Sequence, residues 1–193
     1  MESEVYIRQI TRRILLENSL GPILKPLKKT DIDAVIQVCD KAFSEFSVVG
    51  LQTTCSGQMR GKFDRLANWH KSAKLVLNGE IIGFVIVSDK ETIGGFIEMA
   101  KQYGYNIKID SNRLQSLSVK KGIEIMSIGI LPKYRGEGYG KMLFDFTKTL
   151  GADYIWSVQM KGVSNMDKWA SKGPVVVSGK STGQEFYITI QQA

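Results

Sequence analysis

The run from Ile123 to Leu150 constrains the fold of this chain more than any other segment. It reads as an apolar strand, a glycine-rich turn and an amphipathic helix, which Gly151 ends. The apolar stripe of that helix recurs at three- and four-residue steps, at Tyr139, Met142, Leu143, Phe146 and Leu150. The first backbone N–H groups of a helix have no helical partner, and glycine leaves them open to a ligand. The run therefore predicts a phosphate or diphosphate site where the strand ends and the helix begins.

The spacing within this turn excludes two common phosphate loops. A P-loop needs Ser or Thr after its lysine, whereas Lys141 is followed by Met142. The dinucleotide fingerprint GxGxxG does not fit glycines at 136, 138 and 140. The turn fits R/Q-x-x-G-x-G, and with its flanking strand and helix it resembles the acyl-CoA pyrophosphate loop of the GNAT superfamily of N-acyltransferases. A structural turn without a ligand is the alternative.

The resemblance implies acetyl-CoA as cosubstrate and assigns its binding residues. Those of the loop and the helix start are Arg135, Gly136, Glu137, Gly138, Tyr139, Gly140 and Lys141, and Asn165 follows later. In the family, the backbone of the fourth strand pairs with the pantetheine arm, which implies Ser127, Ile128, Gly129 and Ile130 here. A glycine inside an apolar strand indicates a bulge, a close ligand approach or simple packing, and Gly129 leaves these alternatives open.

Transfer of an acyl group to an amine needs a base for the amine and hydrogen-bond donors for the thioester oxygen. Glu124 lies eleven residues before Arg135. At this offset the resemblance to the histone acetyltransferase branch implies a catalytic glutamate on the fourth strand. Its apolar neighbours are expected to raise its pKa, as a general base near neutral pH requires. The alternative is a strand-end glutamate paired with Lys120 or Lys121.

The chain departs from the family at the position of the general acid. Many members use a tyrosine in the short helix after the fifth strand, and here that position holds Trp169. An indole cannot protonate a thiolate, so Ser164, Ser171 or Tyr187 would substitute, or the thiolate leaves without a dedicated acid. This departure leaves open a second hypothesis, in which the GNAT fold is a binding module without catalysis that contacts a protein or nucleic acid.

Length and composition are typical of a compact enzyme. The chain has 193 residues, one domain by length, and no apolar run near the roughly 20 residues that span a bilayer. With no signal-peptide pattern, a cytoplasmic location without membrane contact is expected. Two cysteines and one histidine predict neither a disulfide scaffold nor a metal site, and Cys55 is expected to be a free buried thiol. The net charge of +7 suits CoA phosphates, acidic peptides or nucleic acid alike.

The order of elements predicts an α/β (α+β) fold. The resemblance to the GNAT superfamily implies a mixed, mostly antiparallel sheet of six to seven strands flanked by helices. Residues 1–21 are expected to be a helical extension, with a helix over 4–20, and residues 22–193 a single acyltransferase domain with an insertion at 88–121. Either added segment could form a homodimer contact or a lid over the acceptor cleft.

Further helices are expected over 30–43, where Thr30 and Asp33 form a capping box, over 58–72, and around 92–103, followed by a short extended piece. Strands are expected at 22–27, 73–77, 81–87, 123–130, 153–158, 174–178 and 185–190, with an Asn-Gly hairpin turn at 78–79 and another turn at 179–183.

The helix expected at 58–72 is basic. It and its flank carry Arg60, Lys62, Arg65, Lys71 and Lys74 against Asp64. In the family this region contributes to acceptor recognition, so the cations could hold an acidic peptide or nucleic acid, or they could form an ordinary solvated helix face. The acceptor itself is expected to be a primary amine of a small molecule or a protein. His70 is expected to be a packed or capping histidine.

Overall fold

The computed structural model describes residues 21–44, 55, 59–90, 92–102, 111–160, 177–181 and 184–192. The helix expected over residues 4–20 and the short helix expected after residue 160 lie outside these ranges. The same holds for Trp169, Asn165, Ser164 and Ser171, so their expected roles stay predictions.

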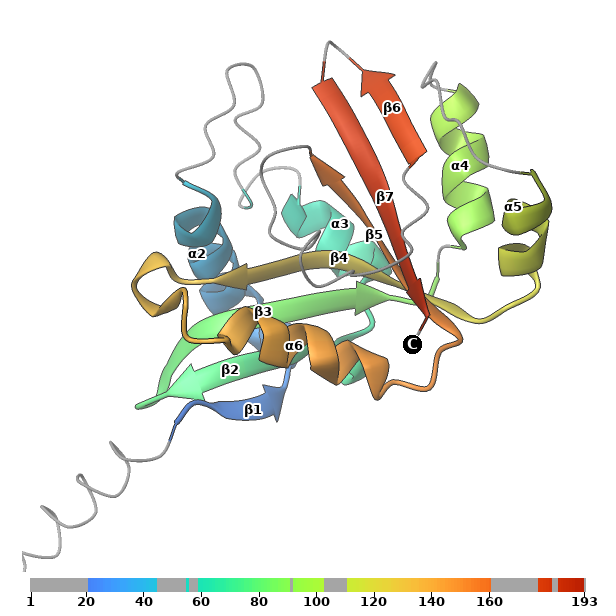
Figure 1. The fold of residues 1–193 in the computed structure, drawn as a ribbon. Helices are drawn as coiled ribbons and strands as arrows, with labels where there is room; N and C mark the ends of the chain where they lie inside the picture. The colour runs from blue at the N-terminus through green and yellow to red at the C-terminus, as the bar shows by residue number, and fades with distance from the viewer. Residues whose placement is uncertain are drawn as a thin grey trace, which may run out of the picture.

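A seven-stranded sheet in the order β1-β2-β3-β4-β5-β7-β6 organises the described chain (Figure 1). Its strands are β1 Ile23–Pro26, β2 Ala73–Leu77, β3 Glu80–Ser88, β4 Gly122–Ile130, β5 Tyr154–Met160, β6 Val177–Ser181 and β7 Gln184–Gln192. Neighbouring strands are antiparallel except β4 and β5, which run parallel. The expected mixed, mostly antiparallel sheet is therefore confirmed.

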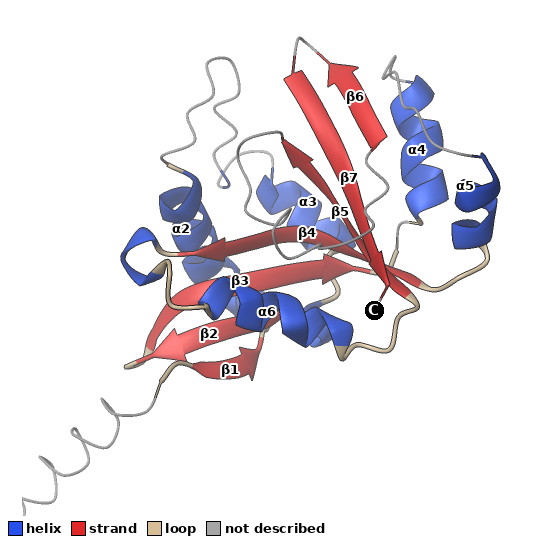
Figure 2. Cartoon of the chain, viewed as in Figure 1, coloured by secondary structure: helices blue, strands red, loops and turns tan. Residues whose placement is uncertain are grey.

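Helices cover both faces of this sheet (Figure 2). They are α2 Ile32–Phe43, α3 Arg60–Leu66, α4 Ile93–Gln102, α5 Ser111–Ser118 and α6 Tyr139–Lys148. A side chain at Gly83 would approach Leu143 of α6, whereas one at Gly129 would approach Ala42 of α2. Gly83 and Gly129 lie on opposite faces, because Gly83 pairs with Ile130. Hence α6 packs on one face of the sheet and α2 on the other.

The Asn-Gly hairpin between β2 and β3 is confirmed. Asn78 and Gly79 both have positive φ angles, 51° and 81°, as a type I′ turn requires. The expected capping box at the start of α2 is wrong, because the Asp31 carboxylate accepts a 2.8 Å hydrogen bond from the Lys28 backbone N–H. A 3-10 turn over Lys29–Asp31 therefore precedes the helix, which begins at Ile32.

The helix expected over 58–72 is shorter than predicted. It ends at Leu66, and Ala67 is extended, with φ −62° and ψ 134°. The chain leaves the helix because the Asn68 backbone N–H donates to the Val87 carbonyl of β3 at 2.8 Å. A 3-10 turn over Trp69–Lys71 follows, and the packed position expected for His70 is wrong, since its side chain is exposed.

The segment 88–121 and the last hairpin also differ from the elements expected from the sequence. The helix expected around 92–103 is confirmed as α4, and a further helix that was not expected, α5, follows at Ser111–Ser118. The two helices contribute Ile93, Ile97 and Leu117 to a second hydrophobic core with Tyr154 and Trp156 of β5 and with Ile188 and Ile190 of β7. The hairpin expected from the last two strands is confirmed by the antiparallel pairing of β6 with β7, but β6 runs to Ser181 rather than ending at residue 178, so the connection is shorter than the expected 179–183.

The expected free thiol is also wrong. Cys39 of α2 and Cys55 form a disulfide with a Cα–Cα distance of 5.9 Å. Both residues are buried in the main core, where α2 packs on the sheet. Disulfides are typical of oxidising compartments, which opposes the cytoplasmic location expected from the sequence. Among the residues that the structure describes, no helix is long and apolar enough to cross a membrane.

Candidate active site

The site begins where β4 and β5 part. The two parallel strands pair in register from Gly122 with Tyr154 to Glu124 with Trp156, and within the described residues this pairing goes no further. Yet β4 continues to Ile130 and β5 to Met160, and Figure 1 shows the strands diverging. The strand edge of β4 beyond Glu124 therefore has hydrogen-bonding groups that β5 does not occupy. Consistent with this, Met126, Ser127 and Ile128 are partly exposed although they lie mid-sheet.

A bulge in β4 determines which side chains share a face of the sheet. The register with β3 pairs Ser127 with Ile86 but Ile125 with Val87, so Met126 is the extra residue. Without it, Glu124 and Ser127 would point to opposite faces, because side chains alternate along a strand. With it, both lie on the face that α2 covers.

Glu124 is buried at the point where the strands part. Its side chain is 2% exposed, and its Oε1 lies 3.3 Å from Nζ of Lys62 on α3. One alternative expected from the sequence was a pair with Lys120 or Lys121. The structure instead pairs Glu124 with a lysine of α3 that lies 62 residues earlier in the chain. The Lys121 backbone N–H instead donates to the Asp153 carboxylate at 2.7 Å.

The glycine-rich loop leads from β4 to α6 through a 3-10 turn over Pro132–Tyr134. Gly136 and Gly138 have φ angles of 88° and 81°, and an added Cβ at either would meet nothing within 4 Å. The positive φ angles favour glycine, and the open space leaves room for a ligand against the backbone. The first hydrogen bond of α6 runs from Met142 N–H to the Gly138 carbonyl at 3.0 Å. The preceding N–H groups, those of Tyr139 to Lys141, are thus left at the helix start for an anion.

The cationic side chains of this loop contact protein groups. The Arg135 guanidinium donates to the Ala42 carbonyl near the end of α2. Lys141 is ion-paired with Asp145 one turn further along α6, and hydrogen bonding to Lys141 lowers the pKa of the Asp145 carboxyl. An anion at this loop would therefore be held mainly by backbone N–H groups and the helix dipole.

Gly129 is explained by packing. An added Cβ would lie 2.9 Å from a ring carbon of Phe84 and 3.3 Å from Cβ of Ala42. The strand is regular there, since Gly129 pairs directly with Phe84. Ile128 and Ile130 lie on the other face, which α6 covers. The bulge alternative for Gly129 is therefore wrong.

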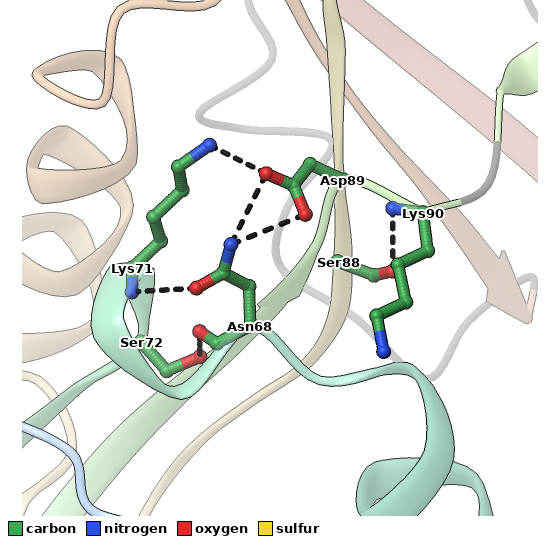
Figure 3. A network of polar contacts seen from close by, with 6 residues as sticks. All are labelled: Asn68, Lys71, Ser72, Ser88, Asp89 and Lys90. Carbon is green, nitrogen blue, oxygen red and sulfur yellow. Dashed lines mark hydrogen bonds and ion pairs between the residues drawn. The ribbon is translucent and has the colours of Figure 1, made fainter.

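Four of the five basic residues in and after α3 form ion pairs with carboxylates, and the fifth, Arg65, donates to the Gly61 carbonyl. Besides Lys62 with Glu124, the pairs are Arg60–Asp33 at 2.6 Å, Lys71–Asp89 at 2.5 Å and Lys74–Asp31 at 2.6 Å. In the network of Figure 3, the Asn68 side chain donates to Asp89 and accepts from the Lys71 backbone N–H. This pairing favours the interpretation as an ordinary ion-paired helix face over a phosphate-binding patch.

Sequence reasoning missed three features of the site: the Lys62–Glu124 pair, the bulge at Met126, and the cover that α4 forms over β5. The rings of Phe96 in α4 and Trp156 in β5 lie 5.5 Å apart between centroids. Lys62 was recognisable only as one cation of a basic helix, and no local signal marks the bulge. In the part of the chain that is described, no group of three His, Cys, Asp or Glu side chains is arranged to hold a metal ion.

Comparison with known proteins agrees with this geometry. The model of the acetyltransferase (GNAT) family matches residues 51–160. No curated protein matches the chain significantly.

Solved structures share the fold at low sequence identity. A GNAT family acetyltransferase from Brucella melitensis in complex with acetyl-CoA is 14% identical, with a TM-score of 0.51, over 89% of this chain and 93% of that one. The PaiA N-acetyltransferase from Thermoplasma acidophilum in complex with coenzyme A is 13% identical, with a TM-score of 0.55, over 90% and 100%. PH1933 from Pyrococcus horikoshii OT3 is 14% identical, with a TM-score of 0.60, over 89% and 98%.

Proposed function

Because the chain belongs to the GNAT acetyltransferase family, we propose that it transfers an acetyl group from acetyl-CoA to a primary amine, by direct attack in a ternary complex. One observation carries the proposal. The strand that parts from its neighbour at Glu124 leads, through two positive-φ glycines, into the open N-terminus of α6. The open backbone edge of β4 is thus followed directly by an anion site, the cradle formed by Arg135 to Lys141. An elongated thioester with a diphosphate at one end requires these two features in this order.

The residues present fit coenzyme A. The loop from Arg135 to Gly140 would hold the diphosphate, with Lys141 N–H at the helix start. The β4 backbone from Ser127 to Ile130 would pair with the pantetheine arm, because β5 does not occupy that edge beyond Glu124. When bound, the cosubstrate supplies an activated acetyl thioester. The protein's contribution is to fix this thioester beside Glu124 and to keep water away.

Glu124 is the proposed general base. It is the last β4 residue that pairs with β5, so it lies at the start of the open β4 edge along which the thioester is proposed to bind, and its side chain shares a face of the sheet with Ser127. Two influences on its carboxylate oppose each other: burial disfavours the charge, and the Lys62 ammonium favours it. A base in this position can accept the proton that the amine must lose before or during its attack. The acceptor amine would approach from the face of the sheet that α2 and α3 cover.

A direct test measures thiol release and acetylated product with acetyl-CoA and a panel of amines. The panel contains a polyamine, an aminoglycoside, a lysine-containing peptide and a peptide with a free N-terminus. We expect at least one amine to be acetylated faster than in buffer alone. Binding of acetyl-CoA without transfer to any amine, and without an effect of Glu124→Gln, would contradict the enzymatic proposal.

A further inference from the structure

The ion pair between Lys62 and Glu124 differs from the others in the described chain. The Glu124 side chain is 2% exposed, whereas the carboxylates of the other pairs are between 19% and 72% exposed. The Lys62 side chain is 33% exposed. One end of this pair is therefore buried in the sheet, and the other reaches it from solvent.

The position of the pair is as informative as its burial. Glu124 is the last β4 residue that pairs with β5, and Ser127 shares its face of the sheet. Lys62 reaches this point from the short helix α3, so its primary amine lies 3.3 Å from the proposed general base. An acceptor amine in the proposed reaction needs the same neighbour at hydrogen-bond distance. Lys62 thus occupies the place of an acceptor.

We propose that Lys62 is an acetylation site that the protein modifies itself, with acetyl-CoA as donor. The inference rests on the proposed function. Glu124 takes one proton from the Lys62 ammonium, and the freed amine attacks the thioester carbonyl. A C–N amide bond forms as the nitrogen loses a second proton to solvent, the C–S bond breaks, and coenzyme A leaves as a thiol once its sulfur takes a proton from Glu124 or solvent. No other reactant is needed.

The modification changes the site in a defined way. An acetylated Lys62 is neutral, so Glu124 loses this cationic neighbour, and its protonated form becomes more favourable. The acetyl group also adds bulk where the acceptor amine would approach. We therefore expect the modified protein to acetylate added amines with a different pH profile from the unmodified protein.

Lys71 provides a matched control. It lies just after α3, its side chain is 27% exposed, and it is ion-paired with Asp89, which is 28% exposed. Lys71 therefore resembles Lys62 in exposure and pairing. Its carboxylate partner, Asp89, follows Ser88 of β3, which pairs with Glu124, so the network of Figure 3 lies on the β3 side of β4 and not at the edge where β4 and β5 part. Nonspecific acetylation by acetyl-CoA in solution should modify Lys62 and Lys71 at similar rates, whereas the proposed reaction should modify Lys62 alone.

The test follows the full-length protein with acetyl-CoA by intact-mass and peptide-mapping mass spectrometry. We expect one acetyl group per chain, on Lys62, at a first-order rate independent of protein concentration, because base and amine belong to one chain. Lys62→Arg should remove the adduct, Lys71→Arg should retain it, and Glu124→Gln should slow it by about tenfold or more. Circular dichroism checks that each variant is folded.

The outcomes separate this inference from the proposed function. Acetylation of an added amine with Lys62 unmodified would overturn the inference and leave the proposed function standing. Equal acetylation of Lys62 and Lys71, unaffected by Glu124→Gln, would show solution chemistry and overturn the inference as well. No transfer to any amine, Lys62 included, by a protein that binds acetyl-CoA would contradict both.

Discussion

The two sides of the proposed site are built in different ways. The cofactor side is one continuous run from Gly122 to Gly151, in which strand, loop and helix follow each other directly. The acceptor side is assembled from distant segments: Lys62 meets Glu124 across 62 residues, and Phe96 meets Trp156 across 60. The cofactor side depends on local backbone geometry, while the acceptor side depends on tertiary packing.

This difference suggests how the two sides could vary independently. A diphosphate presents the same charge and shape in every acyl-CoA, and backbone N–H groups at a helix start suit it without specific side chains. The acceptor face depends on the side chains that α3 and the insertion bring to β4 and β5. Substitutions there should change the acceptor reaction and leave cofactor binding intact.

The largest expected effect separates chemistry from binding. Glu124→Gln keeps the shape of the side chain but removes the base, so kcat for any acceptor should fall roughly 10²- to 10⁴-fold. The dissociation constant for acetyl-CoA should stay within about twofold, because the cradle lies at the other end of β4. Steady-state kinetics and calorimetry measure the two quantities.

Glu80→Gln is the matched control, since Glu80 lies at the start of β3 in an exposed pair with Lys133. It should change neither quantity. A Glu124→Gln variant with unchanged kcat would remove Glu124 from the chemistry.

The next prediction tests whether acetyl-CoA binding depends on the main hydrophobic core and not on the second core. Ile97 of α4 and Ile86 of β3 are both fully buried, but they belong to different hydrophobic cores. Either residue changed to Ala should lower the free energy of unfolding by about 2–5 kcal/mol. Only Ile86→Ala should also weaken acetyl-CoA binding, because β3 supports β4.

Urea unfolding and calorimetry on the same samples measure both effects. Loss of acetyl-CoA binding in a folded Ile97→Ala variant would show that the cofactor side depends on the insertion, and the two sides of the site would then not be separable.

A smaller effect distinguishes packing from ligand contact at Gly129. The Cβ of alanine would meet Phe84 and Ala42 at 2.9 Å and 3.3 Å. Gly129→Ala should therefore lower the free energy of unfolding by about 1–3 kcal/mol. Thermal unfolding with and without acetyl-CoA measures this, and stabilisation by the ligand should match that of the wild type. A stable variant with weakened binding would instead indicate that the ligand approaches Gly129 directly.

The smallest effect concerns the network of Asn68, Lys71 and Asp89, whose first two members follow α3. A hydrogen bond from Lys71 lowers the pKa of Asp89, and burial opposes that effect. Because the pKa is lower in the folded chain than the unfolded value of about 3.9, the stabilisation is complete above that pH and is lost as the pH falls through the folded pKa. Asp89→Asn should therefore cost about 1 kcal/mol at neutral pH and progressively less below about pH 4.

Urea unfolding across this pH range measures the difference. Asp33→Asn is the control, because Asp33 is far more exposed and should contribute little. A cost for Asp89→Asn that does not change with pH would contradict the assignment to this ion pair.

Sequence reasoning succeeded where the signal is local. The glycine loop, the α6 stripe and the Asn78–Gly79 turn each follow from neighbouring residues, because positive φ angles and helical spacing are properties of short segments. The mixed, mostly antiparallel sheet then followed from the resemblance, and the structure confirms it.

Tertiary contacts account for most of what was missed. The chain leaves the helix after Leu66 because Asn68 bonds to β3, and α5 is stabilised by Leu117 in the second core. The Cys39–Cys55 disulfide and the Lys62–Glu124 pair likewise need the folded chain to bring their members together. Neither helical nor strand periodicity contains this information.

The most direct test of the proposed cofactor site is calorimetric titration of acetyl-CoA into the wild type, Gly138→Asp and Gly151→Asp. Both glycines have positive φ, 81° and 68°, and open space around a Cβ, but only Gly138 lies in the proposed cradle. We predict binding to the wild type and to Gly151→Asp, and binding at least about tenfold weaker to Gly138→Asp, which places a negative charge beside the diphosphate. Equal affinities of the two variants, or no binding to the folded wild type, would contradict the proposed cofactor site.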